Sequence, residues 1–454
     1  MKHMSLKEIA AACGGIYYGN DEDYHKEVTN VAIDSRKVEP GGLFVAIRGA
    51  RVDGHMFISQ VMEAGALCAI SEKRIENTAY PYILVHSSLQ ALKDLAEHYR
   101  KSLHVKVVGI TGSVGKTSTK EMIASVLEQK YRVLKTEGNF NNEIGLPLTV
   151  FRIQEEHEIA VLEMGISDFG EMERLARIAR PDICVITNIG NAHLEQLKSR
   201  EGILKAKTEM FRFMNPEGTI ILNGDDDQLA SISRYGKMIP LFFGLSDQLP
   251  VYAEEILSKG LKGTSCRIHI QGEQIKPLIP IPGAHMIYNA LAGASVGMIL
   301  ELSAAEIKSG IESLRPITGR NHLIEKHGLT IIDDCYNANP ASMKASLDVL
   351  AYADTRKVAI LGDMGELGTD TERMHYEVGR FAAEQKVDLL CCIGELSLHM
   401  YQGADSVGEW EGQALHFSKK TDFLAQMQNI ILPGDTVLVK ASHYMDFSEI
   451  VEKL

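Results

Sequence analysis

A glycine-rich segment that ends in lysine and threonine is the part of this sequence best suited to chemistry on phosphates. Gly112 and Gly115 precede Lys116, and Thr117 follows it directly. Glycines let backbone N–H groups approach a phosphate chain closely, and the N-terminus of a following helix adds partial positive charge. In such a loop Lys116 would reach the β- and γ-phosphates of a nucleotide, and Thr117 would ligate Mg²⁺.

The spacing of this segment departs from the strict Walker A pattern, because Ile110 stands where that pattern has its first glycine. The core Gly-x-x-Gly-Lys-Thr is intact and lies between an apolar run at 105–110 and a predicted helix at about 116–130. The simpler interpretation is an ordinary glycine turn with a solvated lysine. The position between strand and helix favours a nucleotide-phosphate loop made of Thr111, Gly112, Ser113, Val114, Gly115, Lys116, Thr117 and Ser118.

Two more polar residues follow buried apolar runs. Glu163 ends the run 159–162, and a carboxylate beside a phosphate loop is where a Mg²⁺ ligand belongs, although such an acid alone is as often a surface residue at a strand end. His193 follows the run 183–186 and the polar residues 187–191. A lone histidine is more often a structural hydrogen-bonding group, but this position favours contact with metal or substrate.

Other polar segments are less specific. The spacing of Lys205 and Lys207 is that of a solvated helix face. Residues 333–340 end another apolar run with two acids, an aromatic and amides, a set that can hold a ribose, a base or a second substrate; the alternative is a loop rich in turn-forming residues. Residues 361–368 do not spell G-x-G-x-x-G, so no dinucleotide site is expected there.

The elements that must position these residues repeat one unit, in which a short continuous apolar run is followed by a polar loop and a segment of helical period. Such runs are typical of strands buried on both faces of a parallel sheet, and the alternation indicates an α/β layer fold. The runs are 105–110, 159–162, 183–186 and 219–222, then 329–332, 358–361, 389–393 and 436–439.

We therefore predict three α/β domains, at residues 1–103, 104–316 and 317–454. The first mixes strands with helices, the second carries the phosphate loop on a parallel sheet, and the third is a smaller Rossmann-like sheet. The first has predicted strands at 31–33 and 43–47 and predicted helices at 58–64 and 89–100. Residues 315–320 contain proline and glycine and are the predicted hinge before the third domain. Ligands of open parallel sheets bind at the carboxyl ends of the strands.

Composition excludes several classes of function. The net charge of -13 argues against a nucleic-acid binder and against an electrostatic membrane anchor. The most apolar stretch, 286–302, is too short and too polar for a membrane span, so we expect a buried helix. The first ten residues lack the apolar core of a signal peptide, and the seven scattered cysteines contain no C-x-x-C pair. We expect reduced thiols and a cytoplasmic protein.

In this order the motifs resemble those of the Mur ligases, which form amide bonds with ATP. Three sets of segments point to the MurF branch, which adds D-alanyl-D-alanine to a UDP-linked muramoyl tripeptide. They are 34–36 with 40–46 and 53–57, then 138–149, then 334–340 with 362–368. The resemblance spans essentially the whole chain and implies an N-terminal UDP-substrate domain, a central ATPase domain and a C-terminal domain that closes over the site.

The resemblance also implies roles for single residues. Glu163 and Thr117 would ligate one Mg²⁺ and His193 a second, supported by a carbamylated Lys207. The catalytic set would be Lys116, Lys207, His193 and Arg320. Nucleotide contacts beyond the loop would come from Asn289, Arg320, Asp334 and Asn337, and substrate contacts from Ser35, Arg36, Asn139, Asn142, Tyr336 and Asn339.

The implied reaction is ligation of D-alanyl-D-alanine to UDP-N-acetylmuramoyl-tripeptide through an acyl phosphate, with ATP and two Mg²⁺ ions, by a monomer in peptidoglycan precursor synthesis. The third residue of the peptide, lysine or diaminopimelate, is left open. One departure concerns the family's Val-Lys-Gly-Ser-Arg near the end, which reads Val-Lys-Ala-Ser-His at 439–443 here. The rigid donor fork of an arginine is lost there.

Three alternatives remain open at this stage. One is another ligase of the same superfamily, such as a different Mur enzyme or folylpolyglutamate synthase, which the segments 34–57 and 138–147 disfavour. A second is a regulatory P-loop ATPase without acid and amine substrates, which Glu163, His193 and Lys207 together disfavour. The third is a scaffold that kept the fold and lost turnover, for which Ala441 and His443 are the only support.

Overall fold

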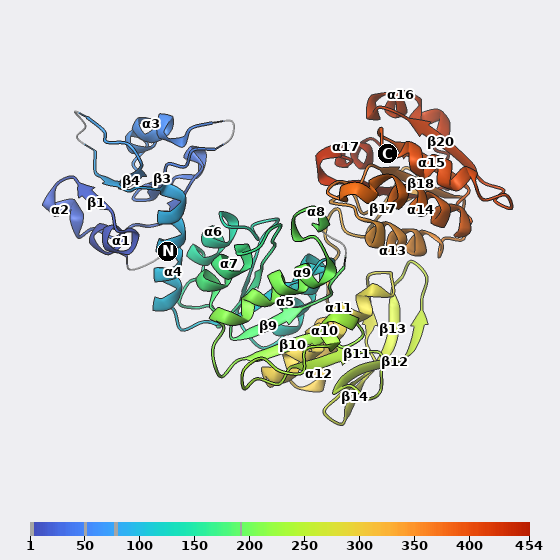
Figure 1. Cartoon of the computed structure of the whole chain (residues 1–454), viewed down its shortest axis with the longest axis horizontal. Helices are drawn as coiled ribbons and strands as arrows, with labels where there is room; N and C mark the ends of the chain where they lie inside the picture. Colours follow the sequence, from blue (N-terminus) through green and yellow to red (C-terminus); the bar gives the residue numbers. More distant parts are fainter. Residues whose placement is uncertain (1–3, 50–51, 77–79, 191–192) are drawn as a thin grey trace. The chain divides into compact units, whose positions relative to one another are not determined.

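The computed structural model describes residues 4–49, 52–76, 80–190 and 193–454. Its contacts group into two compact units. The first comprises Met1–Thr111, Tyr131–Val185 and Lys207–Thr219, and the second comprises Gly112–Lys130, Ile186–Ala206 and Ile220–Leu454. The strands form three sheets, which follow one another along the chain (Figure 1).

The N-terminal sheet has five strands in the order β1-β5-β4-β3-β2. Strands β2 to β5 pair in parallel and β1 pairs antiparallel with β5, around a core that includes Phe44, Val61 and Ala69. The predicted strands and helices are confirmed with small shifts at their ends. The elements are α1 (Leu6–Cys13), β1 (Ile16–Tyr18), α2 (Asp21–Tyr24), β2 (Val31–Ala32), η1 (Ser35–Lys37), β3 (Leu43–Val45), η2 (Gly54–Phe57), α3 (Ile58–Glu63), β4 (Cys68–Ser71), β5 (Tyr82–Leu84) and α4 (Ser88–Ser102).

The central sheet runs in the order β14-β13-β12-β11-β10-β9-β6-β8-β7. Its predicted strands are confirmed, and the pairs β6–β8, β7–β8 and β10–β11 are parallel. Every residue of β8 and β9 is buried, which explains why these strands read as continuous apolar runs. These strands are β6 (Lys106–Thr111), β7 (Val133–Lys135), β8 (Ile159–Glu163), β9 (Ile183–Ile186), β10 (Thr219–Asn223) and β11 (Leu241–Gly244).

One side of this sheet continues into an antiparallel part that the sequence analysis did not predict. Its strands are β12 (Val251–Ser258), β13 (Thr264–Ile270), β14 (Glu273–Ile275) and β15 (Leu278–Ile279), and β13 pairs antiparallel with the other three. Buried and half-buried residues alternate along β13, so only one face is fully covered and no continuous apolar run marks the strand. A search for runs buried on both faces therefore missed it.

The helices of the central part are α5 (Lys116–Leu127), α6 (Gly145–Phe151), α7 (Glu171–Ala179), α8 (Leu194–Leu197), α9 (Arg200–Thr208), η3 (Glu209–Phe213), α10 (Asp227–Ala230), α11 (His285–Ile299) and α12 (Ala304–Glu312). Helix α11 is the predicted buried helix. Gly293 lets it approach α5 closely, because a Cβ there would lie 3.1 Å from the Met122 side chain. This packing fixes the helix that follows the phosphate loop.

The C-terminal sheet runs β16-β17-β21-β18-β19-β20, parallel except for the edge strand β16. Alternate residues of each strand face two separate cores: α13, α14 and α15 cover one face, and α16 and α17 cover the other. Helices on both faces of a mainly parallel sheet confirm the predicted Rossmann-like arrangement. The elements are β16 (His322–Lys326), β17 (Leu329–Asp333), α13 (Pro340–Leu350), β18 (Lys357–Gly362), η4 (Gly368–Asp370), α14 (Thr371–Glu384), β19 (Leu389–Ile393), α15 (Leu398–Asp405), β20 (Gln413–Phe417), α16 (Lys420–Ile430), β21 (Thr436–Lys440), η5 (His443–Met445) and α17 (Ser448–Lys453).

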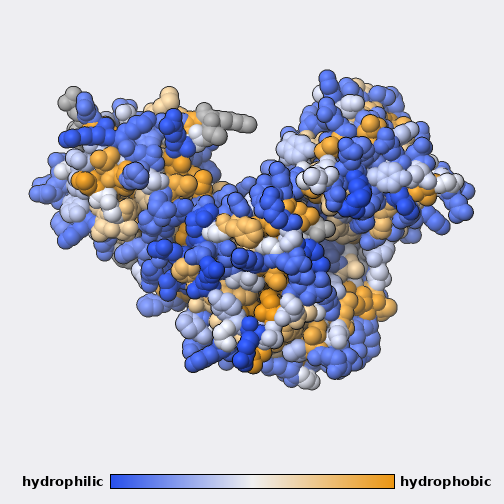
Figure 2. Space-filling model, viewed as in Figure 1, coloured by the Kyte–Doolittle hydropathy of each residue, from blue (hydrophilic) through white to orange (hydrophobic). Residues whose placement is uncertain are grey.

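The visible surface is mainly hydrophilic, with hydrophobic residues in small separate patches (Figure 2). Within the described residues, no helix has the length and apolar character needed to cross a membrane.

Candidate active site

The phosphate loop leaves β6 and enters α5 in a backbone shape that requires glycine at two positions. Gly112 has φ 154° and Gly115 has φ 79°. A Cβ at Gly112 would lie 1.9 Å from the Thr187 hydroxyl oxygen, so no larger residue fits there. Gly115 is the N-cap of α5, and the first N–H groups of that helix point toward the loop. The predicted loop thus has the geometry of an anion cradle.

A second segment, Thr187–Gly190, braces this loop. The Thr187 hydroxyl donates to the carbonyl of Val114 (2.7 Å), and the Asn188 side chain both accepts from and donates to the Val114 backbone (3.0 Å each). The Gly190 N–H donates to the Ser113 hydroxyl (2.9 Å). The polar residues after β9 therefore hold the loop in place. The predicted cluster also included Asn191 and Ala192, which lie outside the described residues.

Lys116 forms hydrogen bonds within the phosphate loop, and Thr119 forms one between α5 and α11. The Lys116 ammonium donates to the carbonyls of Gly112 (2.8 Å) and Ser113 (3.3 Å) in its own loop. One turn into α5, the buried Thr119 hydroxyl donates to Oδ1 of Asn289 on α11 (2.9 Å). The structure thus brings Asn289, a predicted nucleotide-contacting residue, to the N-terminal turn of the helix after the loop.

Glu163 lies beside the start of the phosphate loop. In the parallel pair of β6 and β8 it is opposite Ile110, which immediately precedes the loop. The side chain is buried, and Nδ2 of Asn141 donates to its Oε1 at 2.8 Å. Oε2 is buried and has no hydrogen-bond partner among the described residues. Sequence reasoning did not single out Asn141, although it lies in the quoted segment 138–149, because only sheet order places it next to Glu163.

The two lysines of α9 differ in burial. Lys207 is 2% exposed, whereas Lys205 is exposed. The solvated-face interpretation therefore holds for Lys205 and fails for Lys207. His193 precedes α8 with φ 60°, and its Nδ1 lies 2.9 Å from a carboxylate oxygen of Glu366. Among the described residues no group of three or more His, Cys, Asp and Glu side chains is arranged to hold a metal ion.

The C-terminal residues predicted to contact ligand include a stack of side chains around Tyr336 and a set of hydrogen bonds around Asn337. The Arg320 guanidinium lies 4.2 Å from the ring centre of Tyr336, and the His443 ring lies 5.3 Å from the same ring. His443 thus occupies this stack at the position where the family has arginine. The His443 N–H donates to the Asn337 side chain at 3.4 Å, which links the end of the chain to the loop after β17.

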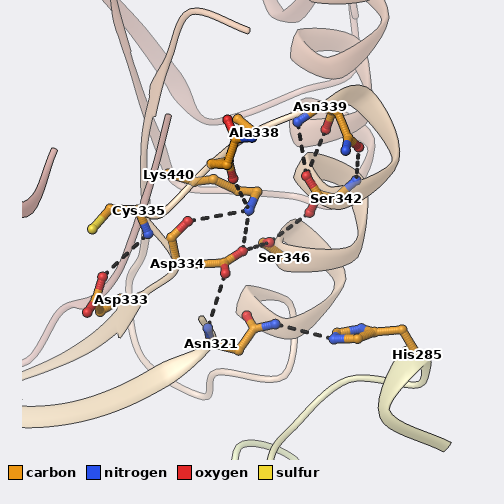
Figure 3. A network of polar contacts seen from close by, with 11 residues as sticks. His285, Asn321, Asp333, Asp334, Cys335, Ala338, Asn339, Ser342, Ser346 and Lys440 are labelled. Carbon is orange, nitrogen blue, oxygen red and sulfur yellow. Dashed lines mark hydrogen bonds and ion pairs between the residues drawn. The ribbon is translucent and has the colours of Figure 1, made fainter. Parts of the chain in front are cut away.

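A buried ion pair holds that loop (Figure 3). The Lys440 ammonium lies 2.5 Å from Oδ2 of Asp334 and also donates to the carbonyl of Asn337 (3.0 Å). Asp334 further accepts from the Ser346 hydroxyl (2.5 Å) and from the Asn321 N–H (3.2 Å). Asp334, a predicted nucleotide contact, is thus an internal anchor of the loop. Sequence reasoning gave no role to Lys440, which is separated from Asp334 by 106 positions.

Two asparagines near this ion pair have different roles: Asn339 lies at the start of α13, and Asn321 lines a pocket. The Asn339 side chain caps α13 by accepting from the Ser342 N–H at 2.9 Å, so its predicted substrate contact would compete with a capping role. Asn321 lines a small pocket together with Ser118, Met286 and Arg320. Its Oδ1 is buried and has no hydrogen-bond partner among the described residues. Asn321 follows Arg320 directly, but nothing in the sequence pattern marked it.

The remaining predicted substrate residues lie in the short helix η1 and in the segment before α6. Arg36 is largely exposed and pairs with Asp34, whose pKa falls to about 2 because it accepts hydrogen bonds from the Arg36 side chain and backbone. Ser35 begins the same short helix, η1. Asn139 is exposed, and Asn142 accepts from the backbone N–H of Gly145 at 2.8 Å at the start of α6.

Family models match three parts of the chain. They are described as the Mur ligase family, catalytic domain (residues 27–100), the Mur ligase middle domain (residues 110–297) and the Mur ligase, glutamate ligase domain (residues 319–443). A UDP-N-acetylmuramoyl-tripeptide–D-alanyl-D-alanine ligase of Bacillus subtilis is 38% identical over 99% of this chain and 98% of its own length. The enzyme of that name from Escherichia coli is 35% identical over 93% of each chain.

Solved structures agree with these matches. A crystal structure of MurF from Acinetobacter baumannii has a TM-score of 0.90 at 30% identity and covers 99% of this chain and 98% of that chain. The MurF ligase from Thermotoga maritima in complex with ADP has a TM-score of 0.82 at 29% identity, over 93% of this chain and 96% of that one. With family models across its length and relatives above 30% identity over nearly all of it, this chain belongs to the Mur ligase family.

Proposed function

We propose that this protein joins D-alanyl-D-alanine to UDP-N-acetylmuramoyl-tripeptide in an ATP-dependent ligation. The observation that carries the proposal is the phosphate loop, which Thr187 and Asn188 hold in place through hydrogen bonds to Val114. The residue before this loop, Ile110, is paired in the sheet with Glu163, whose carboxylate is buried. Relatives that carry this activity in their names match almost the whole chain. A regulatory ATPase would need the loop but would have no use for the rest of the motif set.

The residues around Glu163 fit a bound Mg²⁺ ion. Oε1 is fixed by Asn141, and Oε2 is buried with no hydrogen-bond partner among the described residues, which is costly unless a cation or water completes it. Thr117 is the second residue of α5, the helix after the loop, and is also buried. We propose Thr117 and Glu163 as ligands of one Mg²⁺ and His193 with Lys207 as the support of a second. Bound there, the ions would offset the negative charge of phosphate and carboxylate oxygens.

Lys207 has an environment that suits modification. The Lys207 side chain is 2% exposed, and addition of its amine to carbon dioxide with loss of a proton would place a carbamate at this buried position. The carbamate is an anion with two oxygens, which supplies the ligand chemistry that magnesium prefers. We propose that Lys207, and not the exposed Lys205, is carbamylated.

The chemistry that the chain's residues would support proceeds in two steps. A carboxylate oxygen of the tripeptide attacks the γ-phosphorus of ATP, ADP leaves, and an acyl phosphate results. The dipeptide amine then attacks the acyl carbon, loses a proton and expels phosphate as the amide forms. Lys116 and the loop N–H groups would stabilise charge on the transferring group. Arg320, stacked on Tyr336, would contact the nucleotide from the C-terminal side.

The remaining assignments follow the same proposal. Ser35 and Arg36, with Asn139 and Asn142, would contact the UDP-linked substrate. Asn289 would contact the nucleotide. We propose that the protein acts as a monomer in the cytoplasm, where its seven cysteines, all free in the structure, would stay reduced.

Phosphate release tests the proposal directly. The protein is incubated with ATP and Mg²⁺ and with each UDP-muramoyl precursor, alone and with D-alanyl-D-alanine. Release that requires both the tripeptide precursor and the dipeptide supports the ligase and identifies the third residue of the peptide. ATP turnover without either substrate, or only with a different amino acid or a folate, would refute the proposal.

A further inference from the structure

His375 on α14 is fully buried and makes two hydrogen bonds that fix its protonation state. Its Nδ1 lies 2.7 Å from the carbonyl oxygen of Thr371, one turn earlier in the same helix. Its Nε2 lies 2.9 Å from the backbone nitrogen of Met364, and that N–H can only donate. Nδ1 must therefore carry the proton and Nε2 must accept, so the geometry requires a neutral imidazole.

The bonded segment is the loop after β18, residues 363–367. Met364 and Leu367 are buried in the core between the sheet and α14, and the exposed tip between them is Gly365–Glu366. Glu366 has φ 61°, a conformation that a residue with a side chain adopts only when its surroundings impose it. The hydrogen bond from the Met364 N–H to His375 fixes the residue that directly precedes this tip.

The same loop is joined to the other polar loops at this edge of the C-terminal sheet. The Gly365 N–H donates to the Ser442 hydroxyl (2.9 Å), and the Ser442 N–H donates to the carbonyl of Asp363 (3.1 Å). The next residue, His443, bonds to Asn337. Strand order places the loops after β17, β21 and β18 side by side, where ligands of parallel sheets bind. The β17 loop lies beside Arg320 and the small pocket lined by Ser118, whereas Glu366 at the tip of the β18 loop lies 2.9 Å from His193, so the two loops face different parts of the site.

We propose that His375 is a positioning residue for the acceptor dipeptide: as a neutral imidazole it holds the tip Gly365–Glu366 in the shape that dipeptide binding needs, and its protonation releases the tip. The inference rests on the proposed ligase function. An imidazolium would carry a second N–H at Nε2, facing the Met364 N–H, so the bond would be lost and two donors would oppose each other. Residue His375 touches no reacting atom and acts through the loop.

The charges around His375 set the pH at which this release occurs. Burial lowers the pKa of His375 below its ordinary value; the hydrogen bond to the Thr371 carbonyl and the charge of Asp363 oppose that shift, and His399 on α15 adds to it. From α13, Lys344 faces α14 at the ring of Phe381, 5.6 Å away. Because the pKa is lowered, the imidazole is neutral at neutral pH, and the tip is released only as the pH falls through that lowered pKa.

The test compares pH profiles of the wild type with three variants. H375Q keeps an acceptor near the Nε2 position but does not titrate, H375F fills the space without an acceptor, and H399Q is the control for a nearby histidine that does not hold the loop. KM values for dipeptide and for ATP are measured from about pH 5 to about pH 8, the range in which imidazoles titrate. The amine of the dipeptide also titrates, but it does so equally for every variant. The dipeptide KM of each variant is therefore divided by that of the wild type at the same pH.

H375F is expected to raise the dipeptide KM by roughly tenfold at every pH, because a buried N–H is left without a partner, while the KM for ATP changes by less than about twofold. H375Q is expected to bind dipeptide like wild type near neutrality and to lack the additional rise on the acid side, which H399Q retains. An unchanged dipeptide KM in H375F, or an acid rise that persists in H375Q, would overturn the proposal. If H375F does not fold, the H375Q profile decides.

Nitrogen NMR of the histidine rings gives a readout that needs no activity. The signal that disappears in H375Q is expected to show the Nδ1–H tautomer in the wild type and to convert to imidazolium at a lower pH than an exposed histidine does. A Nε2–H tautomer would refute the positioning role whether or not the protein ligates. Absence of ligation by the wild type, with the expected tautomer present, would instead count against the proposed function.

Discussion

Replacing Lys440 with methionine is expected to destabilise the C-terminal sheet region by about 3–5 kcal/mol, because it leaves a buried carboxylate without its cation. The Lys440 side chain is 3% exposed and that of Asp334 is 11% exposed, so water cannot replace the lost ammonium easily. Methionine keeps most of the apolar stem of lysine, and the change is therefore mainly one of charge and hydrogen bonding.

The magnitude follows from the contacts that disappear. The ammonium loses its bond to the Asp334 carboxylate, and the carbonyl of Asn337 loses a donor at 3.0 Å. Asp334 keeps the hydroxyl of Ser346 and the N–H of Asn321, which are neutral donors and compensate only part of a buried charge. The double variant K440M/D334N removes both charges, so its expected cost is smaller, about 1–2 kcal/mol.

Trp410 provides an assay confined to this region. It is the only tryptophan of the chain, it packs against the core under α13 and α14, and its indole N–H donates to the carbonyl of Val387 at 2.8 Å. Urea unfolding followed by its fluorescence therefore reports the C-terminal sheet. With a slope of about 2 kcal/mol per molar urea, the K440M midpoint should fall by about 1.5–2.5 M.

Two comparisons decide whether the reasoning holds. K453M removes an exposed ion pair with Glu449 in the same region and should leave the midpoint nearly unchanged. K440M/D334N should recover more than half of the K440M loss. A K440M midpoint equal to that of the wild type, or a double variant less stable than K440M, would refute the argument that an unpaired buried charge dominates.

Three further predictions concern the central part of the site. K116A is expected to abolish turnover while the thermal transition is retained, and near-normal phosphate release would contradict the phosphate-loop assignment. K207A is expected to lose activity, which K205A, on the exposed side of the same helix, should keep; equal rates in the two variants would argue against a role for the buried lysine. T119V removes the buried hydroxyl that donates to Asn289 at 2.9 Å and should raise the KM for ATP by roughly five- to tenfold, and an unchanged value would show that this bond does not position Asn289.

The sequence alone determined the local features of this protein. The strands of the two parallel sheets were readable because strands buried on both faces are continuous apolar runs, and the phosphate loop was readable because its glycines and lysine are close together in the chain. The antiparallel strand β13 was not readable in this way, since burial alternates along it. The resemblance to the Mur ligases rested on long motifs and gave the family.

Tertiary structure alone decided which distant residues act together. Asn141 reaches Glu163 because β7 and β8 are neighbours in the sheet, and Lys440 reaches Asp334 because β21 lies beside β17. Helix spacing could not tell Lys207 from Lys205, since burial depends on what covers the helix. The physical reason is the same in each case: sequence patterns report short-range periodicity, whereas sheet order and packing set the partners, the burial and the protonation states of the site.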